Sequence, residues 1–438
     1  MTPVLVAIAD DFSGASDQAG MLARAGVASL LVLDERFEVG EGWEAVTVAT
    51  RLRALPVAEA RPEAARLFKL AASLHPHMIQ YKYCSTFDST PAGNIGPILD
   101  VALDVLRVPG TIVMPALPVN GRTTYLGYHF VRGLPLDESP MSVHPLNPMS
   151  DANLARWLRQ QTPREVGLAS QEFLRAGPRA LRRRLERLWA EGTPYVVVDC
   201  LDQRDVRTIA SAVATVPFIS GSSALAMELP AIWRREGRLG RRHPRQKLLP
   251  QPASAPVLAL AGSCAEQTLR QIEAAEEADI PVLRVDVRAL LTADPAAAAC
   301  KILPKLKKAL AAAEEVLVVA SEEPSRRALS LRRAEAAGLS PRDFGLRIER
   351  LLGEIACLAQ DELGVRHFIC AGGETSGAIS QALGLQAVEI VRELDPGVPL
   401  CQALPERDVV IALKGGNFGR DDFFARAASM ARRVKRGA

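Results

Sequence analysis

Short apolar runs alternate with stretches of helical spacing along most of the chain. In the first half, several aliphatic and aromatic runs predict buried strands. They are Val4–Ile8, Ala45–Ala49, Met78–Tyr83, Thr111–Met114, Tyr195–Val198 and Pro217–Ser220. Apolar residues recur every three or four positions between some of these runs, which predicts helices over Val57–Leu74, Ile95–Leu106 and Pro178–Trp189. Strands that alternate with helices are typical of a parallel sheet flanked by helices.

A basic, proline-rich stretch from Glu236 to Pro256 has no apolar periodicity, and the same alternation restarts after it. The later predicted strands are Val257–Ala261, Val282–Val285, Val316–Ala320, His367–Cys370, Val388–Val391 and Val409–Leu413. The later predicted helices are Ala265–Ala275, Cys300–Ala313, Arg342–Leu363, Ser376–Leu383 and Asp421–Val434. We therefore predict an α/β protein of two domains, each a mostly parallel sheet flanked by helices. The domains are residues 1–236 and 257–438, and residues 237–256 form the linker.

The composition is that of an ordinary globular protein, with 438 residues, 48% of them hydrophobic and 24% charged. The net charge of +3 provides no large positive field for nucleic acid. No apolar stretch approaches the roughly 20 residues of a membrane span. The seven cysteines are widely spaced, without a CxxC pair or zinc-ligand spacing. These features predict a cytoplasmic protein that binds neither nucleic acid nor membrane.

The most informative polar signal is IADDFSGASD at Ile8–Asp17, where the first apolar run stops at two adjacent carboxylates. A hydroxyl, a glycine and helical spacing follow, so we predict a buried strand, a tight acidic turn and a helix. Ligands of open α/β sheets bind beyond the carboxyl ends of the strands, which makes Asp10 and Asp11 candidate site residues. The competing interpretation is that one of them only caps the helix.

Other candidate side chains in the first domain also follow predicted strands. Lys82, Ser85 and Asp88 lie at and after the end of the third predicted strand, where they offer a cation, hydroxyls and a general base. Arg53 follows the second strand, and its planar guanidinium suits a carboxylate partner. Arg122 follows an Asn-Gly turn. Ordinary loop chemistry and solvent-facing arginines are the alternative interpretations.

Three predicted strands of the second domain each open into a glycine-containing turn, at Ala261–Ser263, Ala371–Thr375 and Lys414–Gly419. Glycine lets backbone N–H groups approach a phosphate, and a following helix N-terminus adds partial positive charge. The candidate nucleotide ligands are Ser263, Gly372, Gly373, Glu374, Thr375, Gly415, Gly416 and Asn417. Glycines that only turn the chain are the alternative. Neither a P-loop nor a G-x-G-x-x-G dinucleotide motif is present.

Cations and carboxylates in one domain, with phosphate-binding turns in the other, indicate phosphoryl transfer from a nucleotide to a small anionic polyol. A serine hydrolase lacks support, because the chain has no G-x-S-x-G motif. A lyase or aldolase with Lys82 as its Schiff base is a rival interpretation, although it gives the glycine turns no purpose. A non-catalytic sugar-acid sensor is the other rival, and no helix-turn-helix or basic face supports a transcriptional version.

The motifs IADDFSGASD, KYCSTFDSTPAGNIGP, GGETSGAI and LKGGNFG, in that order, resemble the four-carbon acid-sugar kinase family. STFDST, PALPVNGRTTYLGYHF and HPLNPMSDANL resemble its branch that phosphorylates 3-oxo-tetronates on the 4-hydroxyl. The resemblance runs from Val4 to about Ala427. It implies an N-terminal domain for the acid sugar, a C-terminal domain for ATP with Mg²⁺, and an active-site cleft between them. A D-erythronate or L-threonate kinase is the alternative within the family.

The resemblance also implies residue roles by position. It places ATP contacts at Ser263, at the Gly372–Thr375 turn and at Gly415. It places the acid-sugar pocket at Asp10, Asp11, Arg53, Lys82 and Asp88. Our hypothesis for the mechanism is that either Asp11 or Asp88 takes the proton of the hydroxyl and that either Arg53 or Lys82 holds the carboxylate. The Mg²⁺ ligands stay open, with Glu374 through a water as one candidate, and a homodimer is compatible with the family. Leu52 departs from the family pattern, because many members have a hydroxyl residue there.

Overall fold

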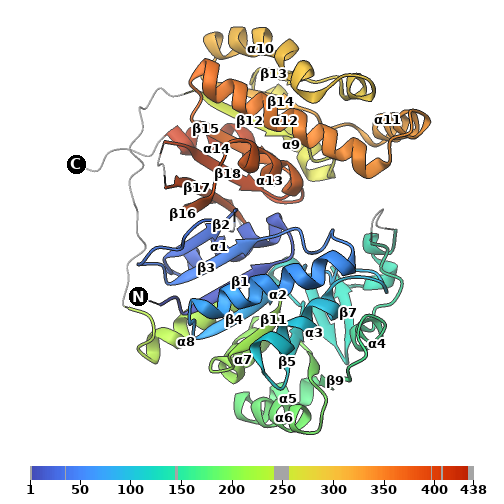
Figure 1. Cartoon of the computed structure of the whole chain (residues 1–438), viewed down its shortest axis with the longest axis vertical. Helices are drawn as coiled ribbons and strands as arrows, with labels where there is room; N and C mark the ends of the chain where they lie inside the picture. Colours follow the sequence, from blue (N-terminus) through green and yellow to red (C-terminus); the bar gives the residue numbers. More distant parts are fainter. Residues whose placement is uncertain are drawn as a thin grey trace. The chain divides into compact units, whose positions relative to one another are not determined.

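The structure is a computed structural model that describes residues 2–34, 36–143, 147–240, 256–395, 397–405 and 408–432 (Figure 1). It divides into two compact units, and unit 1 comprises Met1–Leu30 and Val39–Pro244. Unit 2 comprises Leu31–Glu38 and Arg245–Ala438. The short segment 31–38 belongs to unit 2, where the amides of Leu33 and Asp34 each donate to the carbonyl of Gln386 at 2.9 Å. Of the predicted linker 237–256, residues 241–255 lie outside the described residues.

Unit 1 contains a parallel sheet with the strand order β3-β1-β4-β11-β5-β10-β9. These strands are β1 (Leu5–Ala9), β3 (Ala45–Ala49), β4 (Met78–Lys82), β5 (Thr111–Met114), β9 (Val166–Ala169), β10 (Tyr195–Val198) and β11 (Phe218–Gly221). β2 (Ser29–Val32) runs from unit 1 into unit 2. A separate antiparallel sheet joins β6 (Arg122–Tyr125), β7 (Tyr128–Val131) and β8 (Leu134–Pro135).

The helices of unit 1 bury their apolar stripes against the parallel sheet. They are α1 (Phe12–Arg24), α2 (Val57–Ser73), α3 (Ile95–Leu106), α4 (Leu154–Arg159), α5 (Gln171–Arg175), α6 (Pro178–Ala190), α7 (Gln203–Val213) and α8 (Leu229–Arg235). α1, α6, α7 and α8 contribute to one hydrophobic cluster with the strands, and α2 and α3 pack against each other. Burial of these faces removes apolar surface from water and stabilises the unit.

Unit 2 contains the parallel order β13-β14-β12-β15-β18, followed by the antiparallel strands β17 and β16. The strands are β12 (Val257–Ala261), β13 (Val282–Arg284), β14 (Glu315–Val319), β15 (His367–Ala371), β16 (Ala387–Asp395), β17 (Val398–Leu404) and β18 (Val410–Lys414). The helices are α9 (Glu266–Glu277), α10 (Pro295–Ala312), α11 (Pro324–Ala336), α12 (Pro341–Leu363), α13 (Gly373–Ala382) and α14 (Phe423–Arg432).

In unit 2, α9 and α14 share a hydrophobic cluster with β12, β15 and β18, while α12 contacts α10 and α13. The predicted α/β class, with mostly parallel sheets flanked by helices, is confirmed. No helix in the described part of the chain is both long enough and apolar enough to cross a membrane.

Candidate active site

The first acidic turn has the predicted strand–turn–helix form. Every residue of β1 is buried, Asp10 after it is also buried, and the chain becomes partly exposed only at Asp11. Asp11 has extended backbone angles, and its Oδ1 accepts the amide hydrogen of Gly14 at 2.8 Å, which caps α1. Its Oδ2 makes no hydrogen bond with any residue that the structure describes. Asp11 therefore caps the helix and still presents one free carboxylate oxygen.

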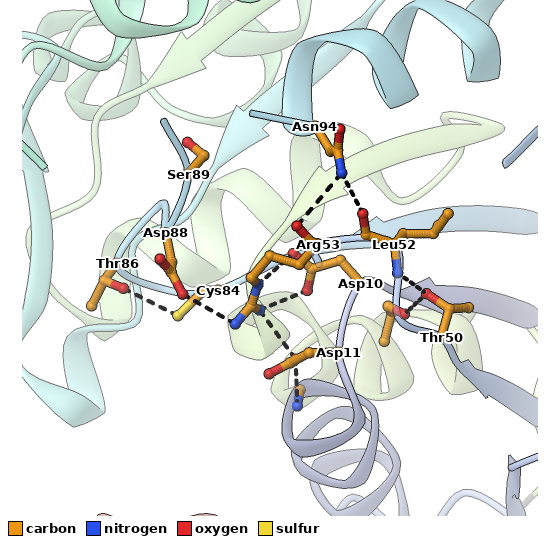
Figure 2. A network of polar contacts seen from close by, with 12 residues as sticks. Asp10, Asp11, Thr50, Leu52, Arg53, Cys84, Thr86, Asp88, Ser89 and Asn94 are labelled. Carbon is orange, nitrogen blue, oxygen red and sulfur yellow. Dashed lines mark hydrogen bonds and ion pairs between the residues drawn. The ribbon is translucent and has the colours of Figure 1, made fainter. Parts of the chain in front are cut away.

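The guanidinium of Arg53 lies among three carboxylates (Figure 2). It donates to both oxygens of Asp10, from Nε at 2.9 Å and from Nη2 at 2.7 Å. Nη2 also lies 3.1 Å from Oδ1 of Asp11, and Nη1 lies 3.2 Å from Oδ2 of Asp88. The other oxygen of Asp88 accepts a hydrogen bond from Nδ2 of Asn147 at 2.9 Å. Arg53 is therefore engaged with all three aspartates.

The neighbouring aspartates have different pKa values for physical reasons. Burial raises the pKa of Asp10, even though the charge of Arg53 acts in the opposite direction. Burial also opposes ionisation of Asp11, but the charges of Arg53 and Lys82 outweigh it and lower the pKa of that carboxyl. Of this pair, Asp11 is therefore the carboxyl whose pKa is lowered, and it retains a free oxygen.

Lys82 ends β4, and only 3% of its surface is exposed. Within the described ranges, its ammonium makes neither a hydrogen bond nor an ion pair. A Cβ atom on Gly14 would lie 2.6 Å from Nζ of Lys82 and 2.4 Å from Oδ1 of Asp11. The absence of a side chain at Gly14 therefore lets this ammonium approach the carboxylate. A buried cation without a direct partner is a candidate ligand for an anion.

Gly14→Ala is expected to keep the protein folded and to raise the KM for the acidic ligand by about 10²-fold. The added methyl group would displace the flexible end of Lys82 and press on Oδ1 of Asp11, while alanine remains a good residue inside α1. Steady-state kinetics with each substrate varied in turn will measure the change, and thermal unfolding will report the fold. Gly40→Ala is the matched control, because nothing lies within 4 Å of a Cβ atom there. An unchanged KM in Gly14→Ala would contradict this role of Lys82.

A pocket of about 290 Å³ adjoins the Arg53 cluster within unit 1, and its lining includes Asp10, Arg53, Asp88 and Asn147. The N-terminal ends of α2 and α3 also line it. The N-cap residues of these helices, Pro56 and Asn94, make no side-chain capping bond. In α3, however, the amide of Gly96 donates to Oε1 of Gln161 at 3.0 Å and Pro97 has no N–H, so few backbone donors remain for a ligand at this helix end. Asp11 and Lys82 are not part of this lining. The pocket and the cluster share Asp10, Arg53 and Asp88.

The segment after β4 is held by a histidine from the small antiparallel sheet. Nε2 of His129 lies 2.9 Å from the carbonyl oxygen of Ser85, and Nδ1 lies 3.0 Å from Oγ1 of Thr124. Because a carbonyl only accepts, Nε2 carries the hydrogen and Nδ1 accepts from the threonine. Phe87, two residues after Ser85, is buried with φ of 54°, a strained conformation for a bulky residue. His129 is therefore a positioning residue for this segment.

Burial lowers the pKa of His129 to about 4 from an ordinary value of 6.5. His129 therefore takes up a proton near pH 6.5 in the unfolded chain but only near pH 4 in the folded protein. Because the unfolded state binds more protons between these values, the free energy of unfolding falls as the pH drops from 6.5 to 4. The expected loss is at most about 3 kcal/mol. Urea unfolding at pH 7, 5.5 and 4 should show a smaller loss in His129→Gln, which keeps an amide donor for Ser85. Parallel pH profiles of the two proteins would refute the assignment.

Arg122 makes no hydrogen bond or ion pair with the Arg53 cluster among the described residues. Its Nη1 donates to the carbonyl of Asn120, and its Nε is buried without a partner among the described residues. Burial lowers the pKa of this guanidinium. The structure therefore brings Asp10, Asp11, Arg53 and Asp88 together in direct contact, with Lys82 beside them. The substrate roles of Ser85 and Arg122 stay predictions.

In unit 2, the three glycine turns meet at one edge of the sheet. β12, β15 and β18 are adjacent and parallel, and Ala261, Ala371 and Lys414 lie at the same register. The turns also contact one another closely. A Cβ on Gly262 would lie 2.4 Å from Oγ1 of Thr375, and one on Gly416 would lie 2.3 Å from Oγ of Ser263. Glycine is required at these positions because the neighbouring turns occupy the space of a side chain.

α13 begins at Gly373, three residues before the predicted start, so the second turn forms the first turn of a helix. The amides of Gly373, Glu374 and Thr375 precede the first intrahelical donor, Ser376, whose amide donates to the carbonyl of Gly372 at 2.8 Å. Among the described residues, no carbonyl accepts from the amides of 415–417 either. These free N–H groups and the helix N-terminus form an anion-binding edge. The predicted nucleotide ligands therefore lie together, although their contacts with a nucleotide stay predictions.

Comparison with known proteins follows the same division of the chain. Residues 5–229 match the family model described as a sugar-binding N-terminal domain, and residues 258–424 match a nucleotide-binding C-terminal domain. A 3-oxo-tetronate kinase of Pseudomonas fluorescens is 38% identical over 97% of this chain and 96% of its own. The 3-oxo-tetronate kinase of Salmonella typhimurium is 35% identical over 96% of this chain and 97% of its own.

Solved structures agree with these relatives. A crystal structure from Salmonella typhimurium, provisionally described as a tRNA synthase, has a TM-score of 0.83 and 33% identity over 97% of this chain and 98% of its own. One from Haemophilus influenzae has a TM-score of 0.75 and 32% identity over 97% of this chain and 99% of its own. Fold and site thus define a two-domain protein that combines a sugar-binding with a nucleotide-binding domain. The chain belongs to the four-carbon acid-sugar kinase family.

Several residues at these sites were not predicted from the sequence. Asn147 pairs with Asp88, and Asn94 donates to the carbonyls of Leu52 and Leu55 at 2.5 and 2.6 Å, which shapes the pocket. The side chain of Leu52 is fully buried, and Leu52 does not line the pocket, although its carbonyl accepts from Asn94. The only sequence signal for the two asparagines was their place within the quoted motifs.

Proposed function

We propose that the protein transfers a phosphoryl group from ATP to the 4-hydroxyl of a 3-oxo-tetronate. The observation that carries this proposal is the edge of unit 2 where three glycine turns meet and two of them have free amides, at 373–375 and 415–417. Such an edge suits a polyphosphate, because backbone N–H groups neutralise charge without long side chains. The full-length similarity to 3-oxo-tetronate kinases supports this substrate class. It does not favour the Schiff-base lyase or the sensor.

The chemistry assigned to unit 1 is positioning and proton transfer. Because Arg53 is engaged with three aspartates, we assign the substrate carboxylate to Lys82, whose buried ammonium has no direct partner in the described structure. Asp11 is the general base, since its Oδ2 is free and both oxygens of Asp88 are paired. Asp10, Asp88 and Arg53 keep Asp11 in place. Exclusion of water by the bound substrates limits hydrolysis of ATP.

Magnesium would enter with the nucleotide in this scheme. No group of three or more metal-ligating His, Cys, Asp or Glu side chains occurs in the part of the chain that the structure describes. Mg²⁺ typically keeps several waters and binds phosphates with only one or two carboxylates, so this donor set fits. Glu374, exposed in the first turn of α13, is the carboxylate nearest in sequence to the free amides. The ion would neutralise charge on the phosphates.

A coupled assay of ADP release tests the proposed function. The panel contains both 3-oxo-tetronate stereoisomers, D-erythronate, L-threonate and a five-carbon acid as the size control. We expect the highest kcat/KM with a 3-oxo-tetronate and phosphorylation at its 4-hydroxyl, detected by phosphorus NMR. Preference for D-erythronate or L-threonate would assign the other branch of the family. No ADP release with any four-carbon acid would contradict the kinase function.

Two further expectations belong to this proposal. The composition and the absence of a predicted membrane span favour a cytoplasmic enzyme. A homodimer is compatible with the family, and its test is the mass of the purified protein in solution.

A further inference from the structure

Lys414 is a buried lysine at the last position of β18, directly before the third glycine turn. Only 1% of its surface is exposed. Its ammonium donates to Oγ1 of Thr268 at 3.1 Å and to the carbonyls of Gly415 and Gly416 at 3.1 and 3.2 Å. It also lies 5.8 Å from the ring centre of Phe423. One ammonium thus connects β18, α9, the glycine turn and α14.

These contacts decide which way the turn faces. The carbonyls of Gly415 and Gly416 are held on the side of the ammonium, and Thr268 donates a second hydrogen bond to the Gly416 carbonyl at 2.8 Å. The backbone amides of 415–417 have no carbonyl partner among the described residues. With its carbonyls occupied inside, the turn can offer these amides to an anion.

The charge of Lys414 has no counter-ion in the described structure. No carboxylate lies within 4 Å of its ammonium among the described residues, and its hydrogen-bond acceptors are neutral. Burial lowers the pKa of this lysine to about 7. An uncompensated buried cation is costly, and an anion bound at the turn would offset that cost.

We infer that Lys414 is a positioning residue that fixes the glycine turn at 415–417 and attracts the polyphosphate of the nucleotide. This inference rests on the proposed function, and it goes beyond the turn residues themselves. We expect affinity to rise with the number of phosphates on the nucleotide, and we assign this dependence to Lys414, whose ammonium contacts the backbone of the turn. Lys414 therefore affects the nucleotide indirectly, because it orients the turn and adds positive charge behind it.

Calorimetric titration of Lys414→Met with ATP, ADP, AMP and adenosine tests the inference. We expect ATP affinity to fall on the order of 10- to 100-fold, ADP affinity to fall less, and adenosine affinity to stay unchanged. Methionine has a length similar to that of lysine. In this variant the carbonyl of Gly415 still accepts from the amide of Phe418, and the carbonyl of Gly416 still accepts from the hydroxyl of Thr268. Removal of the unpaired charge should leave the melting temperature equal or higher. A merely structural lysine would instead lower it and weaken all four ligands equally.

Thr268→Val is the companion variant, because it retains the ammonium and removes the hydroxyl that accepts from Lys414 and donates to the carbonyl of Gly416. We expect a smaller loss of ATP affinity, again graded by phosphate number. If Lys414→Met does not fold, the inference is tested by whether the loss of nucleotide affinity in Thr268→Val increases with the number of phosphates. Affinity equal to that of the wild type in both variants would overturn the role of Lys414. If the wild type itself shows no dependence on phosphate number, the proposed nucleotide site fails instead.

Discussion

Asp11→Asn is expected to lower kcat by about 10²–10⁴-fold and to leave the fold intact. Asparagine is as good an N-cap as aspartate, so the bond to the Gly14 amide is retained. The amide cannot take a proton from the substrate hydroxyl, however, and the loss therefore falls on the chemical step. Little change in the KM for ATP is expected, because Asp11 lies in unit 1 and the anion-binding edge lies in unit 2.

The matched control is Asp88→Asn, which alters the neighbouring carboxylate in the same cluster. Asp88 has both oxygens paired, with Arg53 and Asn147, so its substitution should mainly raise the KM for the acid sugar. Single-turnover kinetics separate the chemical step from product release and measure both variants under equal conditions. A large drop of kcat in Asp88→Asn, with kcat preserved in Asp11→Asn, would assign the base to Asp88.

The features that could be predicted from the sequence are those set by local chemistry. β1 and α1 were predictable because an apolar run stops at two aspartates, one of which caps the helix. The meeting of the three glycine turns was predictable because parallel strands of one sheet end at the same edge. The antiparallel strand β17 was not predicted, since the run Val398–Leu404 includes a proline and has no clear alternation.

Long-range pairing explains why the details of the sites were not predictable. Arg53 meets Asp10 and Asp88 across 43 and 35 residues of chain, and sequence gives no sign that one guanidinium serves three carboxylates. The sequence left Arg53 and Lys82 open as ligands of the substrate carboxylate, and in the structure Arg53 contacts three aspartates. The sequence marks Lys414 only as part of a glycine motif. Its burial could not be predicted, because it depends on contacts with helices α9 and α14.

Arg53→Met is expected to destabilise the protein by about 3–5 kcal/mol, because it leaves carboxylates buried without their cation. The side chain of Asp10 is 1% exposed and that of Asp88 is 11% exposed, so water cannot replace the lost partner. Urea unfolding at pH 7 measures the free energy of unfolding. Arg156→Met is the matched control, since Arg156 pairs with Asp151 from a side chain that is 60% exposed, and its loss should cost less than about 1 kcal/mol.

A double-mutant cycle with Asp10→Asn separates the ion pair from simple packing. The double variant Arg53→Met/Asp10→Asn should be less destabilised than the sum of the single variants, with a coupling of about 1–3 kcal/mol. The deficit of Arg53→Met should also shrink as the pH falls from 7 toward 4. Loss of Arg53 removes the influence that lowers the pKa of Asp10 and Asp11, so these carboxyls take up protons earlier and no longer bury a charge. Additive effects that do not change with pH would show that Arg53 contributes through packing alone.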